Sequence, residues 1–119
     1  MSGFSVIDVG DLPGESGGVR KAARRALGAQ AFGFNYFTLP PGQEGREHNH
    51  EENNQEEVYF VVRGSGRMLV GGEEVELKPG RFVRVDPDAT RLPVAGADGL
   101  EFIATGAPVG GGYQPPPWG

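Results

Sequence analysis

From residue 32 onward, short apolar runs alternate with glycine, proline and charged residues. In Phe32–Leu39, Phe32, Phe34 and Tyr36 fall on one face of an extended chain, and Phe37 and Leu39 fall on the other. Such a period of two predicts a β-strand. Six more strands are predicted at Val58–Val62, Arg67–Val70, Val75–Leu77, Arg81–Val85, Arg91–Val94 and Leu100–Thr105. Many short strands without a long central helix predict an all-β barrel or sandwich.

Glycine and proline mark the predicted turns between these runs. The pair Gly71-Gly72 is suited to a tight hairpin, because a two-residue hairpin loop needs positive φ angles. The other predicted turns are Pro40–Gly42, Arg63–Gly66, Pro79–Gly80, Asp86–Asp88 and Ala95–Gly99. The 21 glycines and 10 prolines are therefore interpreted as punctuation between strands, not as a sign of disorder.

The two ends of the chain differ from the middle. Apolar residues in Val19–Leu27 follow helical spacing, and Gly28 stands where a helix stops. The basic residues of this segment, Arg20, Lys21, Arg24 and Arg25, form either a solvated helix face or an arm that docks on an acidic body. In the glycine- and proline-rich tail Ala107–Gly119, Tyr113 and Trp118 either fix the tail to the body or a partner, or leave it mobile.

Length and composition limit the classes of function. A chain of 119 residues fits one domain, taken here as residues 1–119, with a barrel core of about 32–105. The net charge of −5 gives no electrostatic reason to bind nucleic acid or an anionic membrane. Cysteine is absent, which excludes disulfides and thiolate ligands. No segment resembles a signal peptide or a membrane span, so we expect a cytoplasmic protein.

Candidate metal chemistry is concentrated around the two histidines, His48 and His50. In an extended chain, residues two apart point to the same face, so both imidazoles can reach one point. Imidazole and carboxylate together are ligands for Fe, Mn, Ni, Cu or Zn. The alternative is that both histidines are simply solvated in a charged loop. Six acidic residues surround them: Glu44, Glu47, Glu51, Glu52, Glu56 and Glu57.

The spacing Gly42-x5-His48-x-His50, followed by Glu57-x6-Gly64, resembles the first motif of the cupin superfamily. The run Gln55–Gly66 is especially similar to small single-domain bacterial cupins of undefined activity. A second motif is visible in Gly72, Pro79-Gly80 and Asp86–Asp88. The resemblance implies a cupin-like small β-barrel, that is, a double-stranded β-helix or jelly roll. It also implies a divalent metal held by His48, His50 and Glu57, and a homodimer.

The sequence departs from that family in two places. Six residues separate His50 from Glu57, where the family usually has three or four, so Glu52 or Gln55 competes with Glu57 as the oxygen ligand. Arg91 stands where the second motif normally places a ligand histidine, and a guanidinium does not bind metal. Arg91 either holds an anionic substrate in the cavity or neutralises a carboxylate such as Glu57.

Three functional hypotheses follow. The first is a metal-dependent enzyme on a small, anionic molecule, of oxygenase, isomerase or lyase type, with Arg91, Tyr59 and Tyr36 contacting the substrate. The two tyrosines have a simpler alternative, which is packing with a satisfied hydroxyl. The second hypothesis is a non-catalytic barrel that binds a small ligand. The third is a structural protein in which Arg91 replaces a metal ligand.

Overall fold

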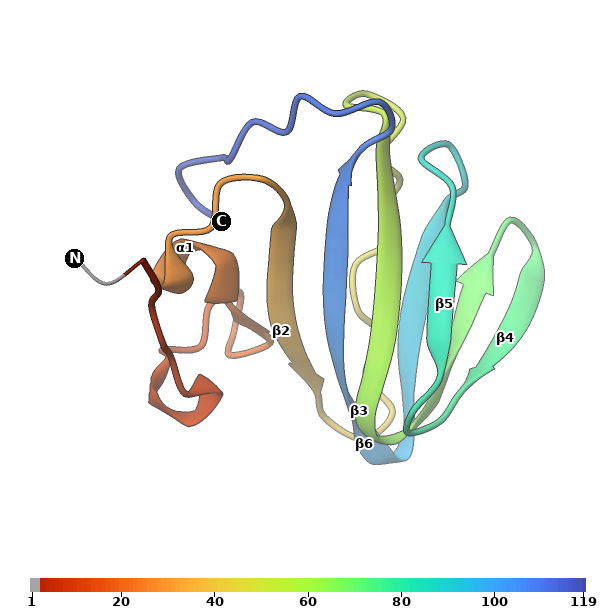
Figure 1. Cartoon of the computed structure of the whole chain (residues 1–119). Helices are drawn as coiled ribbons and strands as arrows, with labels where there is room; N and C mark the ends of the chain where they lie inside the picture. Colours follow the sequence, from red (N-terminus) through yellow and green to blue (C-terminus); the bar gives the residue numbers. More distant parts are fainter. Residues whose placement is uncertain (1–2) are drawn as a thin grey trace.

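The computed structural model describes residues 3–119, and its two longest strands pair with each other along nearly their whole length (Figure 1). Strand β3 is Gln55–Val70, and strand β6 is Arg91–Pro108. They run antiparallel, with Gln55 opposite Pro108 and Val70 opposite Arg91. All the other strands attach to this pair directly or through one neighbour.

Four shorter strands extend the pair into an antiparallel sheet of order β1-β2-β6-β3-β4, and β5 pairs with β3. Strand β2 (Gly33–Leu39) lies along one half of β6, and β1 (Arg20–Lys21) lies along β2. Strands β5 (Phe82–Val85) and β4 (Glu73–Leu77) pair with opposite halves of β3. Because the long strands change neighbours half-way, the sheet curls on itself. The prediction of an all-β barrel is confirmed.

The predicted turns at Arg63–Gly66 and Ala95–Gly99 were wrong as strand boundaries. The chain does bend at these points (Figure 1), yet β3 and β6 remain paired through two register shifts, at Val61/Arg63 and Gly64/Gly66. Gly64 has a φ of 89°, and a Cβ there would overlap the main-chain oxygen of Gly99. Close contact between two bent strands therefore requires glycine, and bulges absorb the bend without ending the strand.

The hairpin turn and the helix end that were predicted from glycine positions are both present. Gly71 and Gly72 have φ angles of 54° and 87° and connect β3 to β4. Gly28 ends helix α1 (Ala23–Leu27) with a φ of 77°, donating its N–H to main-chain oxygens of the last turn. The helix is shorter than predicted, because Arg20 and Lys21 pair with β2 instead. A short 3-10 helix, Val9–Asp11, precedes them.

The core lies inside the curled sheet. Its fully buried side chains come from five strands: Leu39, Val61, Met68, Leu77, Val85 and Leu100. Phe102 completes this cluster and stacks on Phe37, with ring centroids 5.0 Å apart. Within residues 3–119, no helix has the length and apolar character needed to cross a bilayer.

Candidate functional site

The segment that holds the two histidines runs beside the first half of β6. The main chains of His48 and Arg91 exchange two hydrogen bonds, of 3.0 and 2.9 Å, and the His50 N–H donates to the oxygen of Pro87 at 2.8 Å. The two imidazole rings then lie side by side, with centroids 5.0 Å apart and planes at 87°. Backbone pairing of His48 with β6 and of His50 with Pro87, before that strand, therefore fixes the direction in which both imidazoles point.

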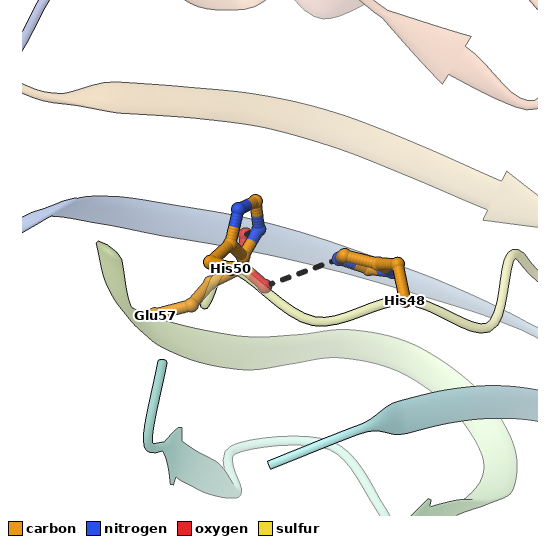
Figure 2. Close-up of side chains that lie close together, drawn as sticks. All are labelled: His48, His50 and Glu57. Atoms are coloured by element: carbon orange, nitrogen blue, oxygen red, sulfur yellow. Dashed lines mark ion pairs between the residues drawn. The ribbon is translucent and has the colours of Figure 1, made fainter. Parts of the chain in front are cut away.

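Glu57 approaches the same point from the start of β3, where its main chain lies between β5 and β6. Its Oε1 lies 3.7 Å from His48 Nε2, and its Oε2 lies 3.5 Å from His50 Nε2. One ligand atom from each of the three residues lies within 4.8 Å of the others. Figure 2 shows the three side chains turned toward one another.

The carboxylate of Glu57 is buried, at 8% exposure. Burial raises its pKa, but the two imidazoles and the Tyr59 hydroxyl, which donates to Oε1, outweigh burial and hold the pKa well below its usual range. Glu57 is therefore ionised, as a metal ligand must be. His48 Nδ1 lies 2.9 Å from the main-chain oxygen of Arg46, which can only accept, so this contact favours a ring whose Nδ1 carries a proton and whose Nε2 points at Glu57.

These three residues fit a divalent metal ion. Metals such as Zn bind nitrogen and oxygen at about 2.1 Å, which puts neighbouring ligand atoms about 3 to 3.5 Å apart. The two carboxylate–imidazole separations, 3.5 and 3.7 Å, are close to this range, and the three ligand atoms all lie within 4.8 Å of one another, so binding an ion draws them together. His50 Nε2 is also buried without a hydrogen-bond partner in residues 3–119. A buried polar atom of this kind is costly unless something else binds it.

The two competing oxygen ligands differ in position. Glu52 is exposed in the loop before β3 and is not part of the three-residue group. Gln55 lines the same cavity as the three candidate ligands, and its Oε1 accepts a hydrogen bond of 3.4 Å from Asn53. The extra residues after His50 form a turn, and Glu57 still reaches the histidines.

Arg91 is completely buried, at 0% exposure, and does not line the cavity. Its Nε lies 3.9 Å from Glu57 Oε1, and its Nη2 donates to the oxygens of Val85 (3.5 Å) and Asp86 (3.1 Å). Nε and Nη1 have no hydrogen-bond partner within residues 3–119. This position places a fixed positive charge behind Glu57, on the side away from the cavity.

A cavity of about 590 Å³ opens beside the candidate ligands. Its floor is apolar, with Phe37, Phe102 and Ala104 from adjacent strands, and Tyr59 lines it near Glu57. Tyr36 is not on this wall, because it is in register with Ile103 and therefore with Phe60, on the opposite face of the sheet from Tyr59. Its hydroxyl donates to Glu101 at 2.5 Å, and burial with this carboxylate raises its pKa to about 12.

The C-terminal tail forms another wall of the cavity, and the basic cluster holds the tail in place. Arg24 is buried and donates to the main-chain oxygens of Gly119 (2.5 Å) and Pro116 (3.3 Å). Arg25 donates to the Trp118 oxygen at 2.7 Å, and the Arg20 guanidinium lies 5.1 Å from the centre of the Trp118 ring. The basic cluster thus holds the tail against the body of the protein. Of the two alternatives considered for this end of the chain, a fixed tail and a mobile tail, the structure shows the fixed one.

Two polar residues of the cavity, Arg46 and Asn35, were not predicted from the sequence. Arg46 lines the cavity beside the histidines. Asn35 of β2 also lines the cavity, and its strand is two strands away from the one that carries Tyr59. The position of Arg46, two residues before His48, was the only available signal for it. Asn35 gave no signal, because its neighbours depend on strand register.

Comparison with known proteins agrees with this geometry. Residues 35–99 match the cupin domain family. The chain belongs to the cupin family. This confirms the predicted family and the cupin-like barrel. No curated protein matches the sequence.

Solved cupin structures share the fold of this cupin across most of its length. A cupin protein from Bacteroides fragilis is 24% identical, covers 92% of this chain and 88% of its own, and gives a TM-score of 0.78. A sugar phosphate isomerase from Silicibacter pomeroyi is 22% identical, with coverages of 86% and 74% and a TM-score of 0.72. A predicted oxalate decarboxylase from Thermotoga maritima is 21% identical, with coverages of 86% and 97% and a TM-score of 0.67. At these identities the likeness shows the fold alone.

Proposed function

We propose that this cupin binds one divalent metal ion through His48, His50 and Glu57 and a small molecule in the adjoining cavity. The observation that supports this most is His50 Nε2, which is buried without a partner and faces the Glu57 carboxylate at 3.5 Å. Three protein ligands leave positions open for a substrate. The candidate ions remain Fe, Mn, Ni, Cu and Zn, since imidazole and carboxylate suit all of them.

The chain's own residues prepare this site for chemistry. When bound, a divalent ion supplies a Lewis acid that polarises an oxygen of the substrate. The Tyr59 hydroxyl fixes the orientation of Glu57, and the Arg46 carbonyl fixes that of His48. Phe37 and Phe102 exclude water from the floor of the cavity. This arrangement suits oxygenase, isomerase or lyase chemistry, and it does not select among them.

The buried pair of Glu57 and Arg91 supports a second candidate, a cupin that binds a ligand or partner without chemistry. Arg91 lies 3.9 Å from the carboxylate and neutralises its charge without any ion. In that case Arg91 replaces the metal, and the cavity serves binding alone.

Metal content decides between the two candidates. Protein purified without an affinity tag, alone and with each ion added, is measured by elemental mass spectrometry beside a His48→Ala/His50→Ala variant. The metal-site proposal expects about one ion per chain, lost in the double variant. Asn49→Ala is the matched control, because Asn49 lies between the histidines and its amide donates to Thr90 instead (3.3 Å). Equal metal content in all three proteins, or none in any, would favour the binding-only candidate.

We also propose that a second copy of the chain covers the outer face of the sheet. Phe82 is 70% exposed there and contacts Phe60, with ring centroids 4.6 Å apart. Phe60 is in register with Ile103 of the next strand, so the apolar row continues across three strands. An apolar row on one antiparallel face is self-complementary about a two-fold axis, which favours a homodimer.

A further inference from the structure

The charges around the proposed metal site do not balance once an ion is present. Glu57 contributes one negative charge, Arg91 contributes one positive charge, and the two imidazoles are neutral as ligands. The group is therefore neutral on its own, and a divalent ion leaves two positive charges without compensation. Glu57 is 8% exposed and Arg91 is 0% exposed, so water screens this excess poorly.

Arg46 adds a free cation on the cavity side of the same site. It is exposed and lines the cavity, and its own carbonyl orients His48. Its guanidinium has no ion pair or hydrogen bond with any residue in 3–119, whereas every other arginine of the chain has at least one such partner. An unpartnered arginine on a cavity wall offers its planar fork of donors to a ligand.

The other charged groups on this wall do not remove the excess. Arg20 is paired with Glu15 at 3.0 Å. Glu44 lies on the wall, exposed, and offsets at most the single charge of Arg46.

From this charge balance and the free guanidinium, we propose that the cavity takes a small dianionic oxyanion, with one end at the metal site and the other on Arg46. The sequence suggested that Arg91 anchors an anionic substrate, and in this proposal Arg46 takes that role. Arg91 adds a positive charge behind Glu57, which increases the negative charge that a ligand must supply. The charge count rests on the metal site proposed above. The contact with Arg46 does not need the ion.

The test measures binding of three probes that share one carbon skeleton and carry progressively less negative charge: succinate, succinamate and succinamide. Isothermal titration calorimetry is run on metal-loaded and metal-free protein, for the wild type, Arg46→Gln and Arg67→Gln. Arg67 is the matched control, because it is half-exposed, pairs with Glu74 and lies off this cavity. We expect succinate to bind metal-loaded wild type at least about tenfold more tightly than succinamate.

Arg46→Gln should weaken succinate binding by about tenfold or more, with metal content and succinamide binding unchanged, and Arg67→Gln should behave as wild type. Arg46→Lys should recover part of the loss, because it restores the charge without the fork. The same loss in metal-free Arg46→Gln would show that Arg46 holds the oxyanion without an ion, which separates this contact from the metal-site proposal.

Two results would overturn the inference. One is equal succinate binding by wild type and Arg46→Gln in a protein that holds its metal, which would leave the metal site intact as a separate conclusion. The other is the absence of succinate binding at millimolar concentration in both metal-loaded and metal-free wild type.

Discussion

Replacing Arg91 with methionine removes the buried charge behind Glu57 and keeps much of the side-chain volume. In the wild type, Nε lies 3.9 Å from Glu57 Oε1, a separation at which two charges interact by about 4 kcal/mol at an effective dielectric constant near 20. The hydrogen bond of 3.1 Å to the Asp86 oxygen adds about 1 kcal/mol. The Tyr59 hydroxyl still holds the carboxylate in the variant. The cost of removing the Arg91 charge from water is no longer present in the variant and offsets part of this sum, so we expect Arg91→Met to lose about 3 kcal/mol of unfolding free energy.

Urea unfolding of the metal-free protein measures this loss. For a small domain with a slope of about 2 kcal/mol per molar urea, the midpoint falls by roughly 1.5 M. Glu57→Gln and the double variant Arg91→Met/Glu57→Gln complete a double-mutant cycle. The double variant should be more stable than the sum of the single changes predicts, by about 2 kcal/mol, because it leaves neither charge buried alone.

The same variant should bind a divalent ion more tightly than the wild type. The ion would bind Glu57, whose Oε1 lies 3.9 Å from Arg91 Nε, so the ion and the guanidinium would repel each other across one carboxylate. Removing the guanidinium should therefore raise the affinity for the ion by roughly tenfold. Competition with a chelator measures the change. Additive effects in the cycle, together with unchanged metal affinity, would refute the view that Arg91 compensates Glu57.

Two further predictions concern the tail and the outer face. Arg24→Ala removes the donors to Gly119 and Pro116, so we expect a loss of about 2 kcal/mol and faster chymotryptic cleavage after Tyr113; cleavage at the wild-type rate would show that the tail is held in another way. Phe82→Glu should convert the proposed dimer to a monomer in sedimentation velocity. Phe4→Glu, at an equally exposed phenylalanine away from the sheet, should not, and identical sedimentation of all three proteins would contradict the proposed interface.

The local features of this cupin were predictable from its sequence, because short-range chemistry determines them. Alternation in Phe32–Leu39 predicted a strand that forms at Gly33–Leu39. Gly71-Gly72 and Gly28 adopt the positive φ angles that their positions required. The spacing of His48 and His50 placed two imidazoles within reach of one point, and the structure keeps them there.

The partners of these residues were decided by strand register, which is not local. Tyr36 and Tyr59 both lie on strands with alternating faces, yet the pairing through Ile103 puts them on opposite sides of the sheet. The turn predicted at Arg63–Gly66 became a bend, because glycine lets β3 stay paired with β6 through a bulge.

Arg46 and Arg91 also show which features the sequence determined and which features only the structure decided. The sequence by itself determined that this barrel has two histidines, a nearby glutamate and an arginine where a fourth ligand is expected. Only the tertiary structure decided that Arg91 lies behind Glu57 and that Arg46 faces the cavity. The reason is that the direction of a long side chain depends on which strands pack around it, and those strands are distant in sequence.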